Sequence, residues 1–243
     1  PRRTIGSGWH LHEIIQHAKL LIMSIESKVL GQQVAYPTDY CPSILVPVPR
    51  SLNREIYDIH TPEELFLGFD TWHAYEAGFL ARNGLPVCGV LKLVYPANSP
   101  CIVESKSLKL YLNSLNMTRL GEDIPSGIET YLQTVKSDLE QILQTCVEAT
   151  FFRQAPEKTY FDFQDYTLLE AIPGIERETF TEYNENPALL ENRTTGRGEI
   201  KVCSHLLRSN CKITKQPDWG SIYIHIQADC LPDHASLLKY IVS

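Results

Sequence analysis

At positions 70–95 the chain reads DTWHAYEAGFLARNGLPVCGVLKLVY, and this stretch decides the fold. The residues from Asp70 to Leu80 favour a strand, and the residues from Val87 to Tyr95 predict a second one. Between them, Asn83-Gly84 is a strong turn signal because both residues accept positive φ angles. The stretch therefore predicts an antiparallel hairpin, which is the unit from which a sheet can be built.

Two helices and further short strands are predicted after this hairpin. Apolar residues recur at helical spacing in the first helix, at Leu108, Tyr111, Leu112 and Leu115. The second helix is expected to begin at a capping box of Ser126 and Glu129, with an apolar stripe of Ile128, Leu132, Val135, Leu139, Ile142 and Cys146. Residues 147–153 and 160–163 favour strands. This order of elements indicates an α+β fold with antiparallel sheets backed by helices.

The second half of the chain repeats this predicted order of strand, connection, strand and helix. A strand is predicted over 196–207, a connection over 211–218 and a return strand over 220–226. The segment SLLKYIVS at 236–243 then aligns with SLKLYLNS at 107–114, with four identical positions. Two matches in the same order indicate a duplicated strand–strand–helix unit. The alignment also predicts that the second copy is truncated at Ser243, about fifty residues short of the first.

These patterns divide the chain into four parts. Residues 1–29 are interpreted as an extension of doubtful function, and 30–165 as the first module. Residues 166–195 are rich in polar and turn-forming types and are read as an excursion between modules. Residues 196–243 form the second module, which is expected to be incomplete.

Composition excludes several classes of protein. The formal net charge of −7 argues against a protein whose main task is to hold a phosphate backbone, so no direct nucleic-acid partner is expected. No apolar run approaches the length that spans a bilayer, so no membrane partner is expected either. The seven cysteines show no C-x-x-C spacing, which predicts neither a disulfide framework nor a zinc site and favours the cytoplasm. Cys203-Ser204-His205 is interpreted as a core cysteine beside a partly exposed histidine, not as a pair of metal ligands.

Two stretches carry residue types suited to chemistry. Cys211 and Asp218 lie seven positions apart on a polar loop, where a thiol nucleophile and a proton donor could be held at a fixed separation. The alternative is a buried free cysteine near a surface carboxylate. The second stretch, Glu104-Ser105-Lys106-Ser107, begins a helix, where N–H groups and the lysine could bind an anion and Glu104 could accept hydrogen bonds from a heterocycle. Its alternative is plain capping, with Ser105 as the N-cap.

The sequence around these stretches resembles a known family. The segments VESKSLKLYLNS at 103–114, SHLLRSNCKITKQPDWGS at 204–221 and VPRSLNR at 48–54 are similar to the NADPH-dependent 7-cyano-7-deazaguanine reductases. These are the nitrile reductases of queuosine biosynthesis, a tRNA modification pathway, and the resemblance is to the bimodular type. It implies two tandem tunnelling-fold (T-fold) modules and a homodimer.

The resemblance also implies roles for individual residues. Cys211 attacks the nitrile carbon to form a covalent thioimidate, and Asp218 supplies a proton. Val103, Glu104 and Ser105 contact the deazaguanine, whereas Ser105 and Lys106 contact NADPH. The family's His-Glu pair and Arg-Gly pair would fall after Ser243.

Two other functions stay open from the sequence. One is an amidinotransferase on the same fold, which would share the thioimidate but need no NADPH. The other is a catalytically inactive module that binds deazapurines.

Overall fold

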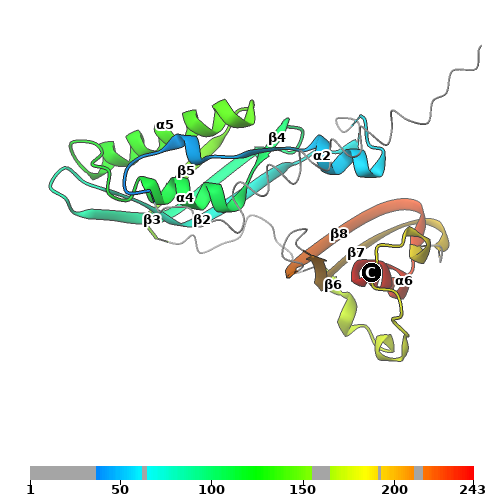
Figure 1. The fold of residues 1–243 in the computed structure, drawn as a ribbon. Helices are drawn as coiled ribbons and strands as arrows, with labels where there is room; N and C mark the ends of the chain where they lie inside the picture. Colours follow the sequence, from blue (N-terminus) through cyan, green and yellow to red (C-terminus); the bar gives the residue numbers. More distant parts are fainter. Residues whose placement is uncertain (1–36, 62–64, 155–164, 191–192, 211–215) are drawn as a thin grey trace, which may run out of the picture. The chain divides into compact units, whose positions relative to one another are not determined.

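The computed structural model describes residues 37–61, 65–154, 165–190, 193–210 and 216–243 (Figure 1). They form two compact units, with the division between positions 157 and 158. The predicted strand at 160–163 lies outside the described residues. Among those that are described, no helix combines the length and the apolar character needed to cross a membrane.

The sheet of the first unit confirms the predicted hairpin. Strand β2 (Phe69–Leu80) pairs antiparallel with β3 (Pro86–Pro96), and β3 pairs antiparallel with β5 (Glu148–Phe152). Gly84 occupies the turn with a φ of 87°, a conformation that side chains disfavour. The hairpin therefore follows from its turn chemistry and its apolar alternation.

A short ribbon connects this sheet to the first helix. Strand β1 (Pro47–Pro49) pairs antiparallel with β4 (Cys101–Val103), and helix α2 (Ser51–Arg54) follows β1. Helix α4 (Ser105–Ser114) follows β4 after one residue. All four apolar residues of its predicted stripe are buried.

Helix α5 (Ile124–Leu143) corrects two predictions. Its capping box is Asp123 with Ser126, because Pro125 lacks an N–H and fits the first helical turn, so the helix starts earlier than predicted. Its most buried stripe, spaced by four residues, is Tyr131, Val135, Leu139 and Leu143. The predicted stripe shares only Val135 and Leu139 with it; Ile128, Leu132 and Ile142 are half-buried, and Cys146 lies beyond the helix and is exposed.

Helices α4 and α5 cover one face of the β2–β3 sheet (Figure 1). Alternate residues of β3, including Leu91, Leu93 and Tyr95, are buried against them. The Phe79 ring of β2 stacks on Tyr131 of α5 with 5.7 Å between the ring centroids. The first unit therefore has a continuous core between sheet and helices.

The second unit is built on a longer hairpin. Strand β7 (Arg193–Asn210) pairs antiparallel with β8 (Pro217–Pro232) and, over two residues, parallel with β6 (Thr167–Leu168). Pro217 and Asp218, predicted on a loop, belong to β8, because a proline is tolerated as the first residue of a strand. Helix α6 (His234–Val242) begins two residues before Ser236. Its apolar side packs with Leu169 and Val202 in a small core.

Five short 3₁₀ turns complete the described structure, at Pro42–Ile44, Glu55–Tyr57, Leu169–Ala171, Ile175–Arg177 and Pro187–Leu190. The mixed class with antiparallel sheets and helices agrees with the prediction from sequence.

Candidate active site

The predicted Glu-Ser-Lys-Ser site is the start of helix α4. Glu104 is the N-cap, with an extended backbone (φ −72°, ψ 129°), and this corrects the expectation that Ser105 would cap the helix. The Glu104 carboxylate accepts hydrogen bonds from the backbone N–H groups of Lys106 (3.0 Å) and Ser107 (2.6 Å). An ionised carboxylate has about four lone-pair positions, so two remain for a ligand. Capping and ligand binding are therefore compatible for Glu104.

Ser107 anchors this segment to strand β1. Its buried hydroxyl donates to the Glu104 carbonyl (2.8 Å) and accepts from the Val46 N–H (3.1 Å). The Glu104 N–H in turn donates to the Val46 carbonyl (2.9 Å). These bonds fix the backbone on both sides of the Glu104 side chain, which suits a binding group that must be held in place.

The other predicted site residues near Glu104 differ in how exposed they are, and therefore in the groups that could contact a ligand. Val103 as a whole residue is 2% exposed, so a substrate could reach only a small part of it. Ser105 is exposed and Lys106 is half-buried, at the positive end of a ten-residue helix. An exposed hydroxyl and an ammonium at this position suit an anionic group such as a phosphate.

The other predicted part of the site lies at the end of the β7–β8 hairpin where the two strands are connected. Asp218 is exposed and pairs with Ser209, and Asn210 pairs with Pro217 at the last position of the ladder. Cys211 follows Asn210 directly and lies outside the described residues. The structure thus places Asp218 one ladder position from the point where the cysteine segment begins.

Trp219 is a neighbour of Asp218 that sequence reasoning missed. Its ring is 65% exposed, and the Arg208 guanidinium lies 5.9 Å from the ring centroid across the ladder. A large aromatic residue left exposed beside a candidate acid is a signal that the sequence pattern carried, since Trp219 falls within the quoted motif. This cation–π pair adds a cross-strand contact of about 0.5–1 kcal/mol beside Asp218.

Cys203 and His205 have the environments predicted for them. Cys203 is buried, and this burial, followed by the nearby charge of Glu170, raises the pKa of its thiol. His205 is exposed and its Nδ1 lies 2.8 Å from the Ser221 hydroxyl. A thiol with a raised pKa is a poor nucleophile, so Cys203 does not compete with Cys211 for that role.

The predicted residues thus fall in both units. Glu104, Ser105 and Lys106 are brought together at one helix start in the first unit. Asp218 lies in the second unit, on β8, which pairs with the end of β7 that directly precedes Cys211.

Comparison with known proteins identifies the family. The family model "Nitrile reductase, 7-cyano-7-deazaguanine-reductase N-term" matches residues 36–151. An "NADPH-dependent 7-cyano-7-deazaguanine reductase" of Acinetobacter baumannii (strain ACICU) is 37% identical over 222 residues, which cover 91% of this chain and 77% of that protein. A protein of the same name from Coxiella burnetii (strain Dugway 5J108-111) is 38% identical over 219 residues, or 90% and 75% of the two chains. The chain belongs to the 7-cyano-7-deazaguanine reductase family.

Membership in this reductase family confirms the resemblance found in the motifs. The family-model match ends within β5, so it covers the first unit and its Glu-Ser-Lys-Ser segment. The similarity to the reductase of A. baumannii extends over 222 residues, more than the 157 positions of the first unit. It therefore continues into the unit that carries the Cys211–Asp218 segment.

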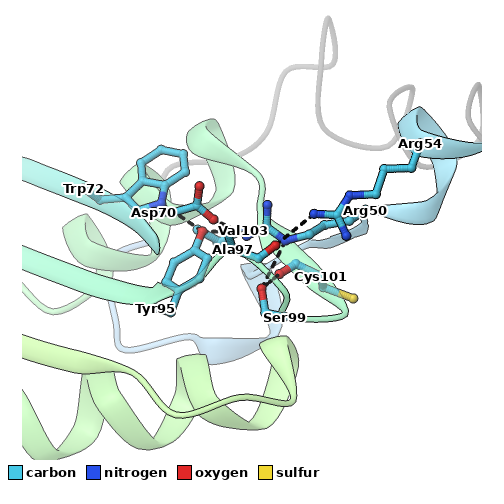
Figure 2. A network of polar contacts seen from close by, with 9 residues as sticks. All are labelled: Arg50, Arg54, Asp70, Trp72, Tyr95, Ala97, Ser99, Cys101 and Val103. Atoms are coloured by element: carbon cyan, nitrogen blue, oxygen red, sulfur yellow. Dashed lines mark hydrogen bonds and ion pairs between the residues drawn. The ribbon is translucent and has the colours of Figure 1, made fainter. Parts of the chain in front are cut away.

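The VPRSLNR segment, which resembles the same family, also has a defined structural place in this chain. Arg50 pairs with Asp70 of β2 and donates from Nε to the Ser99 hydroxyl at 3.1 Å (Figure 2). A cavity of about 440 Å³ opens beside Arg50 and Arg54. Sequence reasoning assigned these residues to the family but to no role, because the partners Asp70 and Ser99 are distant in sequence.

Proposed function

We propose that this protein reduces the nitrile of 7-cyano-7-deazaguanine to the primary amine, 7-aminomethyl-7-deazaguanine, with NADPH as the reductant. The observation that carries the proposal is the similarity to named NADPH-dependent reductases over 91% of the chain. The built carboxylate site at Glu104 and the exposed Ser105 and Lys106 beside it agree with a heterocyclic substrate and a phosphate-bearing cofactor.

Substrate binding is assigned to the start of α4. Glu104 accepts hydrogen bonds from the N–H groups of the deazaguanine through the lone pairs that capping leaves unused. The Val103 backbone and the Ser105 hydroxyl complete the contacts with the heterocycle. Because Glu104 is fixed through Ser107 and Val46, it can orient the ring without moving.

Cys211 is assigned the role of nucleophile. Its thiolate attacks the nitrile carbon, and the nitrogen takes up a proton, which gives a covalent thioimidate. A nitrile is a poor hydride acceptor, whereas the C=N bond of a thioimidate accepts hydride more readily. Asp218, one ladder position from the start of the Cys211 segment, is the proton donor to nitrogen in the reduction that follows.

Ser105 and Lys106 are assigned to the cofactor. Two molecules of NADPH, bound in turn, would each supply one of the two hydrides that take the nitrile to the amine. Its phosphates suit the positive end of α4, where the Lys106 ammonium adds a full charge. Lys106 and Ser105 thus hold the cofactor next to the heterocycle bound by Glu104.

We further infer that the two units are copies of one T-fold module, with boundaries near those predicted at 30–165 and 196–243. Ala74 pairs with Leu91 and Ala77 with Gly89, so two residues of β2 face one of β3; Ser204–Ile222 and Leu207–Gly220 repeat this bulge in the second hairpin. The bulges support a common origin because a one-residue insertion in a strand is a specific backbone feature.

The helices that follow the two hairpins also correspond. Ser107 and Ser236 are both buried at the third helical position, and each donates its N–H to an acidic N-cap, Glu104 or Asp233. At the other end, Ser114 and Ser243 each donate a hydroxyl to the carbonyl three residues earlier. The N–H groups of the first pair of serines and the hydroxyls of the second pair thus have corresponding partners. A homodimer, a place in queuosine biosynthesis and a cytoplasmic location complete the proposal.

The experiment that tests this function mixes the purified chain with 7-cyano-7-deazaguanine and then adds NADPH. A reductase forms an adduct that intact-protein mass spectrometry detects, and then oxidises NADPH as the adduct is consumed. An amidinotransferase would form the adduct and leave NADPH unchanged on addition of ammonia. A module that only binds the heterocycle would show neither, and either of these results would contradict the proposal.

A further inference from the structure

Strand β4 ends immediately before Glu104, so whatever holds β4 also sets the position of the candidate binding carboxylate. Hydrogen bonds link Glu104 to Val46 and Arg50 to Pro100 at the two ends of the β1–β4 ribbon. In an antiparallel ladder such bonded pairs alternate with non-bonded ones. The pairs Pro47–Val103 and Pro49–Cys101 are therefore the non-bonded pairs, and their backbone groups point away from the ribbon.

The outward groups of the ribbon are satisfied differently on its two strands. On β1 the outward positions are Pro47 and Pro49, which have no N–H that needs a partner. On β4 the Val103 N–H donates to the Tyr95 hydroxyl (3.4 Å), and the Cys101 carbonyl accepts from the Ser99 hydroxyl (2.8 Å). Two side chains thus hold the outer edge of β4.

Tyr95 is itself tightly held. It is 1% exposed, and its hydroxyl also accepts a hydrogen bond from the Trp72 indole N–H at 2.8 Å (Figure 2). The Arg50 guanidinium lies 6.0 Å from the centre of its ring. Burial raises the pKa of Tyr95, so its hydroxyl stays neutral. The ring and the hydroxyl are therefore constrained from three directions.

Arg50 joins the two side chains that hold β4. It donates to Ser99 and pairs with Asp70, which lies directly opposite Tyr95 in the β2–β3 ladder. Its side chain is 13% exposed, so these bonds are shielded from water. The network connects the main sheet to the short ribbon that carries the binding segment.

We propose that Tyr95 is a positioning residue for the heterocycle site, and that its hydroxyl fixes the Val103 backbone and thereby the Glu104 carboxylate. The inference rests on the proposed function of Glu104. Tyr95 touches neither substrate nor cofactor in this role, so its loss should affect substrate affinity and leave the reacting groups in place.

The test is Tyr95→Phe, which removes the hydroxyl and keeps the ring. We expect the KM for the nitrile to rise about tenfold with kcat changed less than about twofold, because only uniform binding is lost. The KM for NADPH should not change. In a double-mutant cycle, Tyr95→Phe should have no further effect on nitrile affinity in a Glu104→Gln background, because one residue acts through the other.

Two variants control for folding effects. Tyr131→Phe makes the same chemical change in the same core, at a buried hydroxyl with no hydrogen-bond partner among the described residues. Val135→Ala, in the middle of α5, lowers stability by removing buried methyl groups. Both should retain the wild-type KM for the nitrile.

The outcomes separate this inference from the function on which it rests. A wild-type protein that neither binds nor reduces the nitrile overturns both. An active wild-type protein with an unchanged KM in Tyr95→Phe overturns the positioning role alone. The same holds if Val135→Ala raises the KM equally, or if the effects of Tyr95→Phe and Glu104→Gln simply add.

Discussion

The β2–β3 hairpin of the first unit and the β7–β8 hairpin of the second share their strand pairing and a bulge, but they differ in the connection between the two strands. Both return strands begin with a proline, Pro86 or Pro217, and both hairpins carry a bulge opposite one residue of the return strand. The first is closed by the five residues 81–85, the second by the six residues 211–216. The added length and the candidate nucleophile occur in the same connection.

For the helices that follow the hairpins, α4 and α6, the candidate functional residues lie in the first unit and not in the second. In the first unit the helix start carries Glu104, Ser105 and Lys106, whereas the start of α6 has the acidic cap Asp233 without a lysine in its first turn. Under the proposed function, one scaffold offers two sites, a hairpin end and a helix start, and each unit uses a different one. Such division is common because loops and helix ends can vary without disturbing the core.

The largest effect is expected from removal of the candidate nucleophile, which tests whether the two hairpins differ in function. Cys211→Ala should abolish the covalent adduct with 7-cyano-7-deazaguanine, because no other group is assigned to attack the nitrile. Cys88→Ala, at an exposed cysteine of the first hairpin, is the matched control and should form the adduct normally. Intact-protein mass spectrometry measures both. An adduct that persists in Cys211→Ala would show that the second hairpin does not carry the nucleophile.

The candidate acid comes next in expected effect. Asp218→Asn should form the adduct but slow NADPH oxidation by about 10²–10⁴-fold, because an amide cannot deliver the proton that reduction requires. Asp229→Asn changes an exposed carboxylate elsewhere on β8 and should keep the wild-type rate. Wild-type turnover in Asp218→Asn would assign the proton transfer to another group.

The two helix caps give a comparison between units. Glu104→Gln should weaken binding of the heterocycle by about 2–5 kcal/mol, since donor N–H groups would lose a charged acceptor. Asp233→Asn alters the corresponding cap of α6 and should change only helix stability, by about 1 kcal/mol or less. Titration calorimetry measures the affinities and thermal melting the stabilities. If both variants bound the heterocycle with equal affinity, Glu104 would serve only to cap helix α4 and not to bind the substrate.

The glycines at the two bulges predict the smallest difference. A Cβ on Gly89 would lie 2.3 Å from the Phe152 carbonyl oxygen of β5, whereas a Cβ on Gly220 would meet only a Leu207 methyl group at 3.8 Å. Gly89→Ala should therefore destabilise the protein by about 1–3 kcal/mol, and Gly220→Ala by about 0.5 kcal/mol or less. Urea unfolding measures both. Similar costs would mean that both bulges are equally enclosed in the folded protein.

Local patterns predicted the elements well and their ends less well. The Asn83-Gly84 turn and the stripe of α4 follow from short-range rules, and both were correct. The start of α5 was misplaced because Ser126 and Glu129 match a capping box, yet Asp123 and Pro125 support a helix that begins earlier. Both choices satisfy local rules, and in the structure Asp123 and Ser126 make the two reciprocal bonds of the capping box.

The residues assigned to chemistry, Cys211, Asp218 and the Glu104–Lys106 segment, were proposed from sequence because their contiguous motifs resemble those of the reductase family, whereas residue types and spacing alone left their alternatives open. The hairpins and the duplicated order of elements were also predicted from sequence, because they depend on periodicity and turns. The sequence could not show that Glu104 caps its own helix, that Asp218 lies on a strand, or that Tyr95 and Arg50 hold β4. The Glu104 cap is local, but the general preference for serine at the N-cap pointed to Ser105 instead. The strand position of Asp218 depends on its pairing with Ser209. The support of β4 depends on hydrogen bonds between residues far apart in the chain, such as Arg50 with Ser99 and Tyr95 with Trp72, which form only when the tertiary structure buries these groups together.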